Sequence, residues 1–309
     1  MEFAPIIVFV YDRLDHVKET LQALSENDYA EKSKLFIFSD KYLGDKRNEK
    51  EVLEVREYIS REFWQSKFES VEIVLAEEHK GLANSVIEGV TKIIKEYGKV
   101  IVVEDDLVTA KSFLRYMNEA LDYYEKIDNV WSICGYTLVL NSVKKLKADV
   151  YAGYRGGSWG WATWHNRWEK VDWEVKDFNE FISSEEKMNE FNRGGDDLTK
   201  LLKKQMDGKC DSWAVRWNYQ QYKENMITIF PVKSQVKNIG WDGSGKNCSK
   251  AILKIFDTII EEFSSNIQFC RCEIDKNIMK ETKKAYNESL IGRLSLVITR
   301  HIYSFFRKK

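Results

Sequence analysis

Short apolar runs alternate with helical patterns through the first hundred residues, and this alternation restricts the chain to few folds. Residues 6–10 form a continuous apolar run that is mostly β-branched, as expected of a strand buried on both faces. Three further strands are expected, each after a helical pattern, at residues 35–38, 71–75 and 100–103. Repeated strand–helix units favour a mostly parallel sheet with helices on both faces. We therefore expect an α/β protein.

The second half of the sequence is less regular. A helical pattern and an expected strand at residues 130–134 are followed by a segment rich in glycine and tryptophan at residues 153–161, and then by further helices and a strand. Beyond Cys248 the chain reads as helical and lysine-rich. We therefore expect a main domain over residues 1–250 and a C-terminal helical extension over residues 251–309.

Composition excludes several classes of protein. Hydrophobic residues make up 43% of the chain and charged residues 31%, which excludes a disordered tail. The 48 Lys and Arg are balanced by 49 Asp and Glu, so we expect no nucleic-acid partner. No apolar stretch approaches the roughly eighteen residues of a membrane span. The cysteines are odd in number without CxxC spacing, and the N-terminus has no signal-peptide pattern, so we expect a cytoplasmic location.

Polar residues end three of the expected strands, where ligands bind in open parallel sheets. These are Tyr11-Asp12-Arg13, Ser39-Asp40 and Glu104-Asp105-Asp106. Divalent cations such as Mg²⁺ prefer oxygen ligands and often combine one or two carboxylates with substrate phosphates. The acidic triplet therefore predicts a metal site, with a solvated acidic turn as the alternative. Arg13 and Lys80 are candidate pyrophosphate partners, although each could instead be a solvated surface charge.

Motifs of several other enzyme classes do not occur in the sequence. It contains neither GxGxxG nor GxxxxGK[ST], so dinucleotide and P-loop interpretations lose their main support. Its four histidines form no HExxH motif and no Ser-His-Asp order, which leaves hydrolase interpretations little support.

The remaining motifs together resemble those of GT-A glycosyltransferases. The resemblance rests on the strand ends at Tyr11-Asp12-Arg13 and Phe38-Ser39-Asp40, the run His79–Asn84, and Val102–Asp106. The Glu-Asp-Asp form is most similar to the N-acetylglucosaminyltransferase I group and to bacterial family-2-like sugar transferases. Segments 156–161, 210–213 and 238–245 are similar to the same group, so that the resemblance covers about residues 4–250. Lys246-Asn247-Cys248 departs from the Thr-His-Cys of many bacterial relatives.

The resemblance implies a role for each matching residue. Asp40 would contact the base of a uridine nucleotide, Asp105 the ribose or a neighbouring water, and Asp106 the metal. Arg13 would face the pyrophosphate, and Asp211 would be the catalytic base or, alternatively, a helix N-cap. Further donor-site residues are Tyr11, Lys80, Asn84 and Glu104, and the sugar and acceptor cleft would contain Trp159, Trp161 and Asp242. Both tryptophans could equally be core aromatics.

The implied activity is the metal-dependent transfer of a sugar from a nucleotide sugar, most simply a UDP-sugar, to a hydroxyl of a surface-glycan or lipid-linked acceptor. The metal would be Mn²⁺ or Mg²⁺, and the reaction would invert the anomeric carbon. One alternative is a sugar nucleotidyltransferase, although such enzymes usually begin with a glycine- and lysine-rich loop that this sequence does not have. The other alternative is a catalytically silent carbohydrate-binding or scaffold protein of the same fold.

The last residues, 289–309, have the pattern of a basic amphipathic helix. Apolar residues recur at spacings of three and four, namely Ile291, Leu294, Ile298, Ile302 and Phe305. The segment also contains five basic residues and no acid, namely Arg293, Arg300, Arg307, Lys308 and Lys309. Such a helix can lie on an anionic membrane surface, or it can pack on its own domain. We expect a peripheral position at the inner face of the cell membrane.

Overall fold

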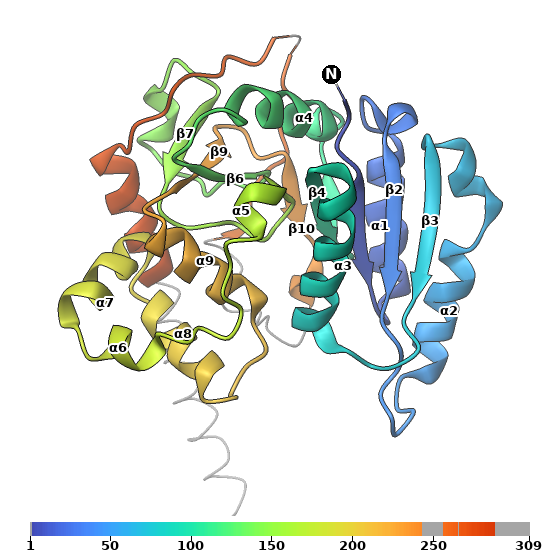
Figure 1. Cartoon of the computed structure of the whole chain (residues 1–309). Coiled ribbons are helices and arrows are strands. Elements are labelled where there is room, and N and C mark those ends of the chain that lie inside the picture. Colours follow the sequence, from blue (N-terminus) through green and yellow to red (C-terminus); the bar gives the residue numbers. More distant parts are fainter. Residues whose placement is uncertain (1, 243–255, 265, 288–309) are drawn as a thin grey trace, which may run out of the picture.

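The computed structural model describes residues 2–242, 256–264 and 266–287, and one eight-stranded sheet runs through it (Figure 1). The strand order is β3-β2-β1-β4-β8-β6-β9-β7. The strands are β1 (Ile6–Val10), β2 (Lys34–Ser39), β3 (Ser70–Leu75), β4 (Lys99–Glu104), β6 (Val130–Cys134), β7 (Val150–Gly153), β8 (Trp161–Trp164) and β9 (Ile227–Pro231). A separate two-stranded sheet pairs β5 (Leu107–Thr109) with β10 (Val236–Asn238).

Most of the large sheet is parallel. Strand β1 pairs in parallel with both β2 and β4, β2 with β3, and β6 with β9. Strand β8 is antiparallel to its neighbours β4 and β6, and β7 is antiparallel to β9. The expected α/β class with a mostly parallel central sheet is confirmed.

Helices cover both faces of the sheet. The helices are α1 (Leu14–Ser25), α2 (Glu49–Ile59), α3 (Gly81–Tyr97), α4 (Phe113–Tyr124), α5 (His165–Trp168), α6 (Phe178–Ile182), α7 (Glu185–Phe191), α8 (Leu198–Met206) and α9 (Trp213–Lys223). Short 3-10 turns lie at η1 (Ala30–Lys32), η2 (Glu62–Ser66), η3 (Val143–Lys145), η4 (Asn192–Gly194) and η5 (Gly240–Asp242).

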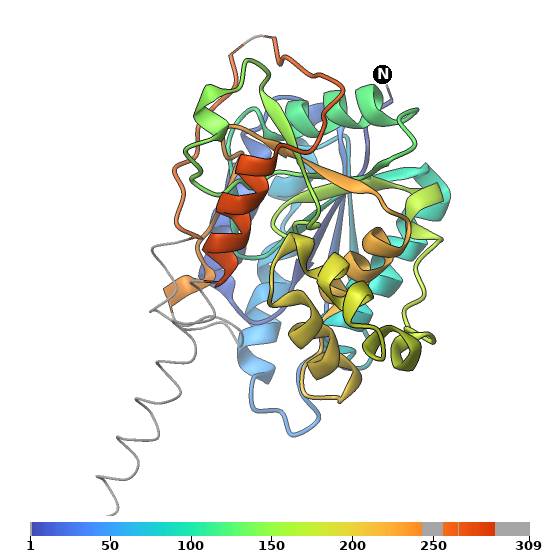
Figure 2. The same cartoon turned by 90° about the vertical axis from the view of Figure 1, so that its left-hand side faces the viewer.

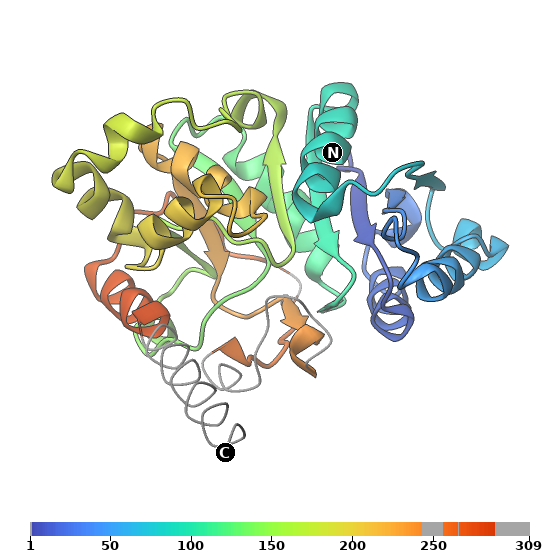
Figure 3. The same cartoon turned by 90° about the horizontal axis from the view of Figure 1, so that it is seen from below.

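The alternation of side chains along β1 divides the core into two layers. Ile6 and Val8 pack in one cluster with residues of α1, α2 and α4, while Ile7 and Phe9 pack in a second cluster with residues of α3 and α9. Successive strand residues point to opposite faces, so a continuous apolar run is what a sheet covered on both sides requires. Figure 3 shows α1 and α3 on opposite sides of β1.

The described residues after 255, where we expect the C-terminal extension, pack on the preceding part of the chain, and much of this segment is not helical. Residues 257–264 and 266–274 have no regular structure, and a helix follows over 276–287 (Figure 2). Phe263 and Ile267 join the core cluster of α4, and Ile278 is 1% exposed. The backbone of the irregular part is held by side chains of α4, because Tyr124 donates to the Cys270 carbonyl at 2.7 Å.

Residues 289–309, for which we expect the basic amphipathic helix, lie outside the described residues. Within the described ranges, no helix is both long and apolar enough to cross a bilayer.

Candidate functional site

The ends of β1, β2 and β4 bring the expected donor-site residues to one edge of the sheet. These three strands are parallel neighbours, so their carboxyl ends lie side by side. Arg13 follows β1, Asp40 follows β2, and Glu104 ends β4 directly before Asp105 and Asp106. This edge points to the bottom of Figure 1, and Figure 3 looks onto it.

Arg13 bridges two of the three acids in the triplet. Its Nη2 donates to Asp105 Oδ1, and its Nη1 lies 2.9 Å from Asp106 Oδ2. Both aspartates are buried. Burial lowers the pKa of the Arg13 guanidinium, but the two carboxylates outweigh this effect, and the pKa is raised overall. Arg13 therefore stays protonated and supplies a positive charge at this edge.

The acidic triplet nevertheless carries more negative charge than Arg13 balances. Burial raises the pKa of Glu104 to about 8, with additional effects from Asp106 and Asp105. Burial also raises the pKa of Asp105 to about 6, although Arg13 opposes this rise. The raised pKa values of Glu104 and Asp105 mean that burial, together with the neighbouring carboxylates, disfavours their ionised forms. A cation bound at this edge would favour those ionised forms.

The second, smaller sheet closes around Asp106. Strand β5 starts immediately after Asp106, and β10 returns alongside it, so that the Ile239 N–H donates to the Asp106 carbonyl at 2.9 Å. Asn238 Nδ2 lies 3.5 Å from Asp106 Oδ1. A Cβ atom on Gly240 would overlap Asp106 Oδ2. The chain can approach the carboxylate this closely because residue 240 has no side chain.

The residues around Asp106 fit a hard divalent cation that is shared with a phosphate ligand. Within the described ranges, no three His, Cys, Asp or Glu side chains form a ready cage for a metal ion. Mg²⁺ and Mn²⁺ sites in nucleotide enzymes need only one or two carboxylates, because phosphate oxygens and waters supply the remaining ligands. Asp106 is the carboxylate that would hold such a cation.

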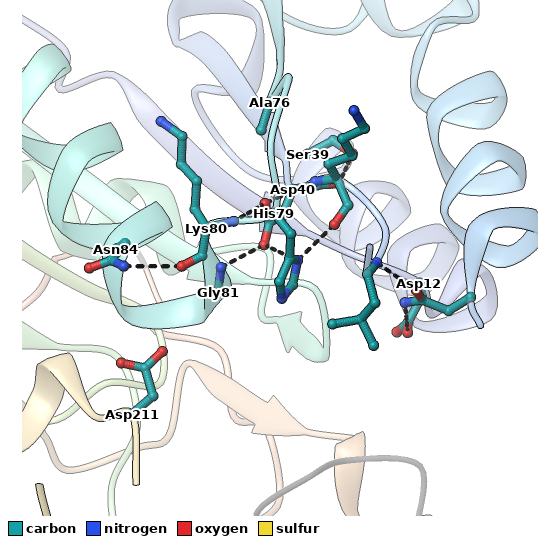
Figure 4. A network of polar contacts seen from close by, with 12 residues as sticks. Asp12, Ser39, Asp40, Ala76, His79, Lys80, Gly81, Asn84 and Asp211 are labelled. Atoms are coloured by element: carbon teal, nitrogen blue, oxygen red, sulfur yellow. Dashed lines mark hydrogen bonds and ion pairs between the residues drawn. The ribbon is translucent and has the colours of Figure 1, made fainter. Parts of the chain in front are cut away.

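Asp40 organises the amino end of α3. Its Oδ1 accepts the backbone N–H groups of Lys41 at 2.8 Å and Lys80 at 2.9 Å, and its Oδ2 accepts that of Gly81 at 2.9 Å (Figure 4). His79 Nδ1 lies 3.0 Å from Asp40 Oδ2 and 2.8 Å from the Lys41 carbonyl. Both partners are acceptors, so Nδ1 carries the proton. Asp40 thus fixes the loop that leads into α3.

The other expected donor-site residues differ in where they point. The Tyr11 ring lies 5.6 Å from the His79 ring, beside the Asp40 loop. The Lys80 side chain points away from Asp211 in Figure 4, and its ammonium pairs with Glu88 on the exposed side of α3. The structure therefore does not bring the Lys80 ammonium to Arg13. Asn84 donates to the Lys80 carbonyl at 3.1 Å in the first turn of α3.

Asp211 reaches the same end of α3 from a distant part of the sequence. Its exposed carboxylate accepts the Ala83 N–H at 3.3 Å, across 128 residues of sequence. The amino end of a helix carries a partial positive charge that favours a carboxylate. Asp211 is not the N-cap of α9, because Ser212 has that position and accepts the Val215 N–H at 3.3 Å.

The residues expected in the acceptor cleft separate into different environments. Trp161 is 0% exposed and packs 5.0 Å from Trp213, so it is a core aromatic and does not line a cleft. Trp159 is partly buried, with its ring 4.6 Å from Tyr136 and 5.7 Å from Trp241. Asp242 ends η5, and its side chain lies outside the described part of the structure.

Two residues of the site received no role from the sequence. His79 stands beside Asp40 within the motif run His79–Asn84, and Gly240 lies against Asp106 within the 238–245 segment. The motifs pointed to both segments. The particular residues could not be found, because their roles depend on contacts with strand ends that are distant in the sequence.

No protein-family model and no curated protein matches this chain. Solved structures with some similarity include TarS of S. aureus (TM-score 0.40, 12% identity, covering 75% of this chain and 60% of that chain). A second is TarS in complex with UDP-GlcNAc (TM-score 0.32, 16% identity, covering 43% and 33%). A third is the mannosyltransferase PcManGT from Pyrobaculum calidifontis with GDP-Man and Mn²⁺ (TM-score 0.35, 12% identity, covering 53% and 44%).

This chain spans less than two thirds of the length of each of these solved chains. All of these TM-scores are 0.40 or lower and all identities are 16% or lower. The evidence for the fold and for the candidate site therefore comes from this chain's own residues.

Proposed function

We propose that this protein is a metal-dependent glycosyltransferase that uses a nucleotide-sugar donor, a UDP-sugar, and a hydroxyl acceptor on a surface glycan or lipid-linked glycan. The observation that supports this most is the clustering of Arg13, Asp105 and Asp106 at the carboxyl edge of parallel strands. Ligands of open α/β sheets bind at this edge. A guanidinium beside a carboxylate pair suits a diphosphate that arrives with a divalent cation.

On the donor side, each residue would contact a different part of the nucleotide sugar. Asp106 would hold the cation, which when bound would stabilise the charge that develops on the departing diphosphate. Arg13 would bind the pyrophosphate, Asp105 the ribose, and Asp40 with Tyr11 the base. Glu104 and Asn84 complete the proposed donor site, and Lys80 would take part through its backbone, which is bonded to Asp40.

On the acceptor side, Asp211 would be the general base. It would take the proton of the acceptor hydroxyl while the hydroxyl oxygen bonds to the anomeric carbon and the bond from that carbon to the diphosphate breaks. Attack from the side opposite the leaving group inverts the anomeric centre. The exposed position of Asp211 at the end of α3 is consistent with access for an acceptor. Trp159 and Asp242 would line the acceptor side.

The test is the release of UDP or GDP from nucleotide sugars, starting with UDP-GlcNAc and GDP-mannose. We expect slow, Mn²⁺-dependent hydrolysis that stops in EDTA. Asp106→Asn should reduce it by about two orders of magnitude, equivalent to ~3 kcal/mol of charge stabilisation. The control is Asp45→Asn, which removes an exposed carboxylate paired with Arg47.

Three results would contradict this proposal. Full activity in EDTA would exclude a metal requirement. Stabilisation by nucleotide sugars without nucleotide release would indicate a silent binding protein. Formation of a nucleotide sugar from a nucleoside triphosphate and a sugar phosphate would indicate a nucleotidyltransferase.

We further propose that the protein works in the cytoplasm at an anionic membrane surface, to which residues 289–309 bind. The support is the basic amphipathic pattern of that segment. The lipid-linked acceptor in the proposed reaction would be found at such a surface.

A further inference from the structure

Arg13, Asn238 and Gly240 surround the carboxylate of Asp106. Oδ2 lies 2.9 Å from Arg13 Nη1 and against the Gly240 backbone, where a Cβ atom would overlap it. Oδ1 faces Asn238 Nδ2 at 3.5 Å. Only 8% of the Asp106 side chain is exposed. Among the residues that the structure describes, Arg13 is the cationic side chain that pairs with Asp106.

We infer that Arg13 holds Asp106 closed to free divalent cations, and that the diphosphate of the donor opens it by drawing Arg13 away. This inference rests on the proposed function. A guanidinium and a divalent cation on one poorly solvated carboxylate repel each other, so the metal gains full access to Asp106 only when Arg13 moves. The planar fork of arginine binds phosphate as well as carboxylate, so a diphosphate can replace Asp105 and Asp106 as its partner.

Binding of metal and donor would then be coupled. The factor by which the diphosphate raises metal affinity must equal the factor by which the metal raises diphosphate affinity. The cation would enter together with the donor, and the acidic triplet would not retain a cation after the nucleotide leaves. Metal binding and donor binding would be coupled because Arg13 bridges Asp105 and Asp106.

The experiment measures Mn²⁺ binding to the full chain by the electron paramagnetic resonance signal of unbound Mn²⁺, with and without UDP. In the unaltered protein we expect weak Mn²⁺ binding that becomes at least about tenfold tighter with saturating UDP. Arg13→Gln should bind Mn²⁺ alone at least about tenfold tighter than the unaltered protein, and UDP should then add little. The matched control is Arg61→Gln, which removes an arginine that lies over the Tyr58 ring at 4.9 Å.

A double variant separates the contact from net charge. Arg13→Gln with Asp105→Asn removes one positive and one negative charge, so the cluster keeps its charge while Asp106 loses its partner. The inference requires this variant to bind Mn²⁺ alone more tightly than the unaltered protein. Because the double variant leaves the net charge of the cluster unchanged, it can fold even if Arg13→Gln alone does not. The test therefore does not depend on the single variant.

Equal Mn²⁺ affinity of the double variant and the unaltered protein would overturn the inference, because charge alone would then explain the single variant. An Arg13→Gln protein that binds Mn²⁺ no more tightly would overturn it as well. Neither result bears on nucleotide release in the presence and absence of EDTA, which tests the proposed function separately.

Discussion

At the scale of single residues, three aspartates at one sheet edge differ in what already occupies their oxygens. Asp40 accepts three backbone N–H groups, and Asp106 is enclosed by Arg13 and Gly240. Asp211 is exposed and accepts the Ala83 N–H at 3.3 Å. A general base must have an accessible oxygen within hydrogen-bond reach of the proton that it takes. Of these three carboxylates, Asp211 meets this requirement best.

We therefore predict that Asp211→Asn lowers turnover by about two to four orders of magnitude, the usual contribution of a positioned general base. Donor affinity should stay unchanged, because the asparagine oxygen can still accept the Ala83 N–H. Steady-state transfer kinetics and UDP-sugar titrations measure the two effects. Asp207→Asn, which alters an exposed aspartate paired with Lys209, is the control. A variant with weaker donor binding but normal turnover per bound donor would assign Asp211 to the nucleotide site instead.

At the scale of elements, the amino end of α3 connects the donor and acceptor sides. Asp40 caps it from β2, and Asp211 approaches it from the segment before α9. Gly81 starts the helix at φ 76°, and a Cβ atom there would lie 3.2 Å from Asp211 Oδ2. The conformation and the close approach both favour glycine at this position.

We predict that Gly81→Ala lowers both stability and turnover, while Gly98→Ala lowers stability alone. Gly98 follows the end of the same helix at φ 73°, and a Cβ atom there would have no other atom within 4 Å. The two variants therefore share the backbone strain of about 1–2 kcal/mol. Only Gly81→Ala also displaces Asp211. Urea unfolding and transfer kinetics separate these effects. Equal turnover in the two variants would show that the position of Asp211 does not matter to catalysis.

The sequence predicted the parallel half of the sheet and did not predict the short or mixed elements. Strands β1, β2 and β4 are covered on both faces, so their apolar runs are continuous and easy to recognise. Strand β3 lies at the edge of the sheet, is partly exposed and contains Glu72. Strand β8 has only four residues, and its local sequence pattern does not predict that it lies antiparallel between β4 and β6. Strands β5 and β10 have three residues each. Such short strands form because they pair with strands that are distant in the sequence, and local sequence propensity does not predict this pairing.

The same limit applies to the site. Strand ends placed Arg13, Asp40 and Asp106 correctly at one edge, because parallel neighbours end together. The sequence left open whether Lys80 is a surface charge and whether Trp161 is a core aromatic, because packing partners elsewhere in the chain decide both. The contact between Asp211 and α3 likewise depends on the folded arrangement of distant segments.

At the scale of the whole molecule, the described residues after 255 contribute to the same core clusters as residues 2–242. Ile278 is 1% exposed within a cluster that includes Tyr136 and Tyr151, whereas Ile259 is 79% exposed. We predict that Ile278→Ala lowers the free energy of unfolding by about 2–4 kcal/mol, as expected for a buried isoleucine. The identical change at Ile259 should cost less than about 0.5 kcal/mol. Equal, small effects in urea unfolding would mean that helix 276–287 does not add to the stability of the domain.

The second prediction at this scale concerns the attachment of the whole molecule to a membrane. Residues 289–309 contain five basic residues and no acid, and each basic residue near an anionic surface contributes about 1 kcal/mol. The full chain should therefore sediment with anionic vesicles at low salt, bind less at high salt, and bind neutral vesicles weakly. A chain that ends at residue 287 keeps the described core and should stay in the supernatant. If the two chains bind anionic vesicles equally, residues 289–309 are not the membrane contact, and packing on the protein becomes the better explanation for their apolar face.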